Sequence, residues 1–94
     1  MQKMKANKQM TEREQKREND AEAYCIKADF KFFQIEGNEL PKSTITEVID
    51  LYRKSAWYNN SKAMMALGKI YEEGLYVKQD NNESLKWYQN AAEN

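Results

Sequence analysis

LYRKSA at residues 51–56 and WYQNAA at residues 87–92 lie 36 residues apart and share one pattern, two large residues and, after two further positions, two small ones. The register extends upstream, where Glu47 is matched by Glu83 and Ile49 by Leu85. Similarity at a fixed period of this length is typical of helical repeat arrays. The small residues allow neighbouring helices to approach closely. The pattern therefore predicts stacked helical hairpins.

Turns and helix caps divide the chain into four predicted helices. They cover residues 11–36, 44–58, 61–73 and 81–92. Almost no period-two alternation is present, so strands are not expected. The predicted fold class is all-α, a short α-solenoid of antiparallel helix pairs.

The predicted helix ends carry specific signals. Capping boxes are predicted for Thr11 with Glu14, Thr44 with Glu47, and Asp80 with Glu83, and a simple cap at Asn60 or Ser61. Left-handed stops are predicted at Gly37 with Asn38, and at Gly74.

Composition excludes several classes of function. Lysine plus arginine and aspartate plus glutamate number 15 each, so there is no overall charge to attract a nucleic acid or an anionic membrane. Histidine is absent, and the single Cys25 lies on an apolar stripe, which indicates a structural thiol rather than a nucleophile or a metal ligand. We expect no enzymatic activity, no cofactor, no metal and no small-molecule substrate. The charged first residues do not resemble a secretory signal, so a cytoplasmic location is expected.

A group of residues at fixed spacing between Ala63 and Glu93 resembles the Sel-one-like repeat, a relative of the tetratricopeptide repeat. The matching residues are Ala63, Leu67, Gly68, Tyr71, Gly74, Val77, Asp80, Trp87, Tyr88, Ala91 and Ala92. Two positions depart from the family pattern, because Tyr76 replaces a glycine and Ser84 an alanine. Tyr76 predicts a loop backbone different from the family norm.

The resemblance also predicts how the chain is divided into segments. Residues 1–22 are expected to be a charged helical extension, 23–58 a degenerate first repeat and 61–94 a Sel-one-like repeat. A one-residue slip in register pairs Phe30 with Leu67 and Gly37 with Gly74. The resemblance implies a scaffold or adaptor module that binds another protein. The alternative is a regulatory or inhibitory subunit, of the immunity type, that blocks a site on an enzyme or effector.

The third helix is one candidate for partner binding. In the related tetratricopeptide arrangement, the first helix of each pair lines a concave groove in which a peptide or helix docks. By that resemblance the partner-binding residues are Lys62, Met65, Lys69, Glu72 and Glu73. A plain solvated helix face is the alternative.

The segment from Tyr24 to Gly37 carries two apolar stripes on opposite sides. One contains Ile26, Phe30 and Phe33, and the other contains Cys25, Ala28, Phe32 and Ile35. One interpretation buries both stripes, one against neighbouring helices and the other under the segment that begins at Thr11. The other interpretation leaves Phe32 and Ile35 partly exposed as anchors for a partner.

The last candidates lie outside the inward-facing repeat positions. Trp57 falls outside the recurring aromatic pair and is expected at the surface. At the N-terminal end of the stack, the charged residues 11–20 can shield the apolar surface of the repeats. No polar helix is expected to cover the other end, after the last helix. We therefore expect an open apolar face formed by Leu85, Tyr88, Gln89 and Ala92. A second copy in a two-fold arrangement, another protein, or further repeats downstream would cover it.

Overall fold

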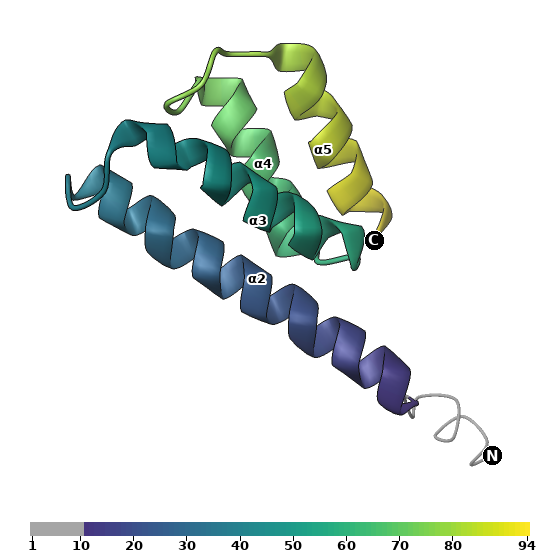
Figure 1. The fold of residues 1–94 in the computed structure, drawn as a ribbon. Helices are drawn as coiled ribbons and strands as arrows, with labels where there is room; N and C mark the ends of the chain where they lie inside the picture. The colour runs from purple at the N-terminus through teal and green to yellow at the C-terminus, as the bar shows by residue number, and fades with distance from the viewer. Residues whose placement is uncertain (1–10) are drawn as a thin grey trace.

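The computed structural model describes residues 11–94, which form four α-helices and confirm the predicted all-α class (Figure 1). The helices are α2 (Glu12–Glu36), α3 (Ile45–Trp57), α4 (Ser61–Glu73) and α5 (Asn81–Glu93), and a 3₁₀ turn, η1 (Lys42–Thr44), precedes α3. Each helix end lies within one residue of its predicted position. Within the described range no residue is in a strand. The first ten residues of the predicted charged extension, 1–10, lie outside that range.

Three of the four predicted N-caps form. The Thr11 hydroxyl and the Glu14 side chain make a reciprocal capping box. Asn60 Oδ1 accepts from the Ala63 amide at 3.0 Å, and Asp80 Oδ1 accepts from the Glu83 amide at 3.0 Å. The second half of the capping box predicted for Asp80 is absent, because the Asp80 amide donates to the Tyr71 carbonyl and the Glu83 carboxylate bonds Trp87.

The cap predicted at Thr44 is wrong. Its side chain makes no cap hydrogen bond, and its backbone is already helical at φ −65° and ψ −13°. A capping side chain needs an extended backbone to reach back to the first amides of the helix. The 3₁₀ turn removes that geometry because it leads directly into α3.

The stop after α4 is confirmed, since Gly74 has φ 64°. After α2 the stop falls one residue later than Gly37. Gly37 has φ −87°, and Asn38 takes the left-handed conformation at φ 64°. Asparagine tolerates this conformation better than most residues.

Each helix packs on the next one along the chain, so that α2 lies along α3, α4 on α3, and α5 on α4 (Figure 1). The core joins α2, α3 and α4, with Ala28, Val48 and Leu67 fully buried. Tyr71 and Trp87 are partly buried against this core, as the repeat predicts. Of the helices in residues 11–94, none is long and apolar enough to cross a membrane.

Neither interpretation of the two stripes of α2 is fully correct. Cys25, Ala28 and Ile35 are buried, so Ile35 is not an exposed anchor, and Phe32 is half-buried. The stripe of Ile26, Phe30 and Phe33 is the exposed one. The segment from Thr11 cannot cover it, because that segment and the stripe belong to one continuous helix.

The predicted pairing of Phe30 with Leu67 is also wrong. Leu67 is fully buried in α4, whereas Phe30 is exposed. Helix α2 therefore presents to α3 a different face from the one that the one-residue slip implied.

Candidate functional site

A hollow of about 230 Å³ lies where side chains of α2, α3 and α4 meet. Its lining residues come from all three helices and from the loop after α4. They are Phe32, Glu36, Tyr52, Ala66, Lys69, Ile70, Glu73 and Leu75. We call this feature the α2–α4 groove. It forms because α2 and α4 both pack on α3, which leaves a channel between them.

The floor of the groove is apolar and well supported. Ile70 and Tyr52 are buried, and Ala66 is half-buried. The Tyr52 hydroxyl donates a hydrogen bond to the Asp29 carboxylate, which ties α3 to α2. Burial, together with this bond, raises the pKa of Tyr52 above its ordinary value. The ring is therefore held neutral in the floor.

The loop after α4 forms an end wall of the groove. The Tyr76 ring meets Phe32 edge to face, with centroids 5.9 Å apart and planes inclined at 67°. Tyr76 has φ 61°, in the left-handed region that favours glycine. The backbone at Tyr76 is therefore one that glycine adopts readily, although the residue there is a tyrosine. The aromatic contact offsets part of the conformational cost.

The rim of the groove is charged. Glu36 approaches from α2, and Lys69 and Glu73 from α4, and all three are exposed. Two carboxylates and one ammonium group give the rim a net negative charge. An apolar floor with such a rim suits an apolar side chain that has a basic neighbour.

The structure brings three predicted partner-binding residues together at this groove, Phe32, Lys69 and Glu73. Lys62 and Met65 are exposed on α4 but do not line it. Glu72 is turned toward α5, where its Oε1 accepts from the Tyr88 hydroxyl at 2.8 Å.

The comparisons with known proteins give one family. Residues 61–94, which hold α4, α5 and five of the eight residues that line the groove, match the family model of the Sel1 repeat. The match covers 34 of the 94 residues, and we call this segment the Sel1 repeat. Curated proteins and solved structures contain no match to the chain. Sel1 repeats are generally non-catalytic protein-interaction modules.

The outer helix of the Sel1 repeat only partly forms the predicted open face. Leu85 is 56% exposed, and Gln89 and Ala92 are exposed. Tyr88 instead packs across Gly68, where a Cβ atom would lie 2.7 Å from its ring. The apolar part of this face is therefore a single large side chain.

Trp57 is 81% exposed, as predicted. It borders a second hollow, between α3 and the Sel1 repeat, with Arg53 and Trp87. Arg53 and Trp87 are both held by Glu83, through an ion pair of 3.8 Å and an indole hydrogen bond of 3.1 Å. These contacts fix the relative position of α3 and α5.

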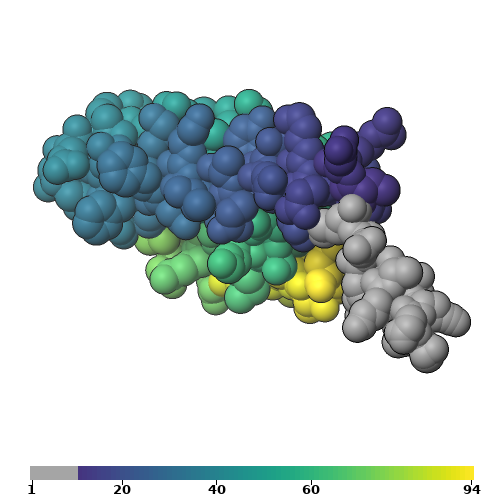
Figure 2. Space-filling model, turned by 90° about the horizontal axis from the view of Figure 1, so that it is seen from below, coloured from purple at the N-terminus to yellow at the C-terminus, as the bar shows by residue number. Residues whose placement is uncertain are grey.

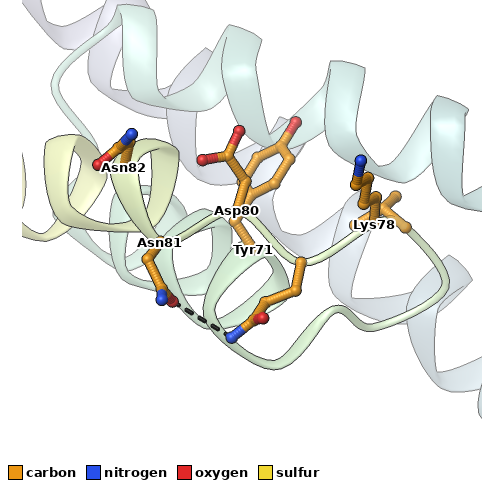
Figure 3. A pocket seen from close by; sticks show the side chains of 7 residues that line it. Tyr71, Lys78, Asp80, Asn81 and Asn82 are labelled. Carbon is orange, nitrogen blue, oxygen red and sulfur yellow. Dashed lines mark hydrogen bonds between the residues drawn. The ribbon is translucent and has the colours of Figure 1, made fainter.

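A third hollow lies in the turn of the Sel1 repeat, where Tyr71 and Asp80 lie side by side and Lys78 and Asn82 lie to either side (Figure 3). Its polar groups hold the turn itself. Gln79 Nε2 donates to Asn81 Oδ1 at 3.2 Å and to the Glu72 carbonyl at 2.9 Å, and Asp80 caps α5. This hollow is part of the turn rather than a recognition surface.

Sequence reasoning missed several residues of the α2–α4 groove. Glu36, Ala66, Ile70 and Leu75 line it, together with Tyr52. Tyr52 carried a signal, since it matches Tyr88 in the 36-residue repeat, but that signal identifies a packing position and not a groove. The other four come together only through the angle between helices.

Proposed function

We propose that this chain is a scaffold or adaptor module that binds a segment of another protein in the α2–α4 groove. The observation that carries the proposal is the groove itself, an apolar floor from three helices under a charged rim. Membership of residues 61–94 in a family of interaction repeats supports it.

The chemistry of the rim defines the preferred segment. An apolar side chain would enter between Phe32, Ala66 and Ile70. A lysine or arginine beside it would pair with Glu36 and Glu73. Lys69 would discriminate against a second basic residue on its side of the groove.

The test is a selection of random linear peptides displayed on phage against the immobilised chain, followed by calorimetry on the recovered peptides. We expect an apolar residue next to lysine or arginine to be enriched. Glu36→Gln with Glu73→Gln should weaken binding about tenfold, since two charge pairs are lost. Ala66→Trp, which fills the groove, should abolish binding. Glu93→Gln, an exposed neutralisation on α5, serves as the control and should leave the affinity unchanged.

Peptides without this pattern would contradict the proposed specificity. Peptides that bind equally well to the Ala66→Trp protein would contradict the groove as the site. Circular dichroism of each variant establishes that the helices are intact.

A further inference from the structure

Three of the six large hydrophobic residues that are exposed within residues 11–94 lie together on α2. Ile26, Phe30 and Phe33 are 57%, 62% and 69% exposed, and they lie at spacings of four and three residues on one side of the helix. We call them the outer stripe. Helix α2 runs along one whole side of the molecule, and in the view onto that side no other described helix crosses in front of it (Figure 2).

The size of the outer stripe is that of an interface centre. Two phenylalanines and an isoleucine with these exposures present on the order of 400 Å² of apolar surface. A standard interface buries about 800 Å² per partner, with an apolar centre and a polar rim. The stripe accounts for such a centre, and the flanking side chains of α2 would supply the rim.

The spacing continues beyond the stripe. Ala23 and Asn19 extend the alternation of three and four residues toward the N-terminus of α2, and both are exposed. This is the spacing by which two parallel or antiparallel helices pack side by side. The opposite side of α2 packs on α3, so the rest of the described chain does not obstruct a second helix from packing on the outer stripe.

The two edges of the stripe differ in charge. Glu22, Asp29 and Glu36 follow one edge, which is acidic, and Asp20, Lys27 and Gln34 follow the other, which has no net charge. In an antiparallel pair related by a two-fold axis, like edges meet, so carboxylates would face carboxylates. In a parallel pair the acidic edge of each helix instead meets the uncharged edge of the other, so this repulsion is absent. Glu22 then lies five residues before Lys27 of the second helix, the spacing of attractive pairs across parallel helices.

From this complementarity we infer that two copies of the chain pair through the outer stripe, with their α2 helices parallel and in register. The two-fold axis runs along the pair of helices, which makes the interface self-complementary and closed. This inference goes beyond the proposed function, because the stripe and the floor of the α2–α4 groove use different residues, and of the edge residues only Glu36 also lies on the groove rim. Glu22 also accepts from Asn60 Nδ2 at 3.4 Å, and a carboxylate can accept further bonds.

The first test is the mass of the chain in solution, by size-exclusion chromatography with light scattering. We expect a species of twice the 11.1 kDa chain mass. Ile26→Glu or Phe30→Glu should give the monomer with unchanged helix content, since these side chains are mostly exposed. Leu85→Glu is the matched control, because Leu85 is as exposed as Ile26 but lies on α5, and it should remain a dimer. A monomeric wild-type chain, or a dimer that Leu85→Glu dissociates and Ile26→Glu does not, overturns the inference.

The second test concerns orientation. Asn19→Cys should form an intermolecular disulfide on mild oxidation, because parallel helices in register place the two positions together. An antiparallel pair centred on the stripe separates them by several turns. Lys27→Glu should raise the dissociation constant about tenfold, and Glu22→Lys with Lys27→Glu should restore it. A dimer without this cross-link, or without rescue by the double exchange, overturns the parallel arrangement.

Discussion

At the scale of single residues, the closest approach between helices is made at Gly68. A Cβ atom at this position would lie 2.7 Å from Tyr88 Cε1 and 2.8 Å from Cδ1. The Tyr88 ring is held there by its hydrogen bond to Glu72. Ser84 donates to the Gly68 carbonyl at 2.8 Å, so the hydroxyl that replaces the family's alanine has a partner. The glycine is therefore required by packing and not by its backbone angles.

Gly68→Ala should lower the free energy of unfolding by about 1 kcal/mol. Overpacking costs about 1–3 kcal/mol, and the better helix propensity of alanine returns about 1 kcal/mol. In a Tyr88→Ala background the clash is absent, so the same substitution should stabilise the chain by about 1 kcal/mol. Urea unfolding followed by circular dichroism measures both values. The same sign in both backgrounds would refute this account of Gly68.

The thiol of Cys25 and the hydroxyl of Tyr52 lie in the α2–α3 contact, and both have a raised pKa. Burial, and then the charge of Asp29, raises the pKa of the Cys25 thiol to about 11. Burial and the bond to Asp29 raise the pKa of Tyr52 as well. Both groups are therefore held in their neutral forms between α2 and α3, in agreement with Cys25 as a structural thiol.

The chain should lose stability in alkali for this reason. The folded pKa values lie above the unfolded ones. The contribution of Cys25 is therefore present below pH 9, the ordinary thiol value, and is lost as the pH rises toward 11, while that of Tyr52 is lost from pH 10, the ordinary phenol value, upward. Each group contributes a slope of up to about 1.4 kcal/mol per pH unit within its own range. Urea midpoints measured across this range should fall. Cys25→Ala with Tyr52→Phe should flatten the curve, and an equally steep fall in that variant would show that other groups are responsible.

At the scale of helices, the caps of α3 and α4 show how local signals are overridden. Both Thr44 and Asn60 were predicted as caps from residue type and position. Only Asn60 has the extended backbone that a cap needs, at φ −85° and ψ 108°. The proline at residue 41 begins a tight turn, and α3 continues from that turn without a break.

The two caps should therefore respond differently to alanine. Asn60→Ala should cost about 1 kcal/mol, because the Ala63 amide loses its partner. Thr44→Ala should change stability by less than about 0.5 kcal/mol. Thermal unfolding of the two variants beside the wild type gives the comparison. Equal losses would mean that Thr44 caps α3 in solution.

At the scale of the whole molecule, the Sel1 repeat depends on α3. Leu67 and Ile70 of α4 belong to a core cluster that also contains residues of α2 and α3. Helix α5 contributes one buried residue, Ser84, so it adds little core of its own. A hairpin of this kind buries its apolar face only when a neighbouring helix covers it.

A peptide of residues 61–94 should therefore be largely unfolded in isolation, although it contains the complete family match. Circular dichroism should show much less helix per residue than the full chain, with no cooperative thermal transition. The full chain, measured in parallel, is the reference. Cooperative unfolding of the peptide at the temperature of the full chain would show that the repeat carries its own core.

The order of the helices, most of their ends and the family of residues 61–94 follow from the sequence alone. These features depend on neighbours within a few residues, such as Asp80 and Glu83, or on a repeat spacing that can be read directly. The groove could not be predicted in this way. Phe32 and Ala66 come together because α2 and α4 both pack on α3, and no local pattern specifies the angle between these helices.

The assignment of the two stripes of α2 needed the tertiary structure. Periodicity shows that Ile26, Phe30 and Phe33 share one side and that Cys25, Ala28 and Ile35 share the other, and both sides are apolar enough for a core. Helix α3 can cover only one of them. The small Ala28 lets α3 approach closely, so the stripe with smaller side chains is buried and the two phenylalanines remain at the surface.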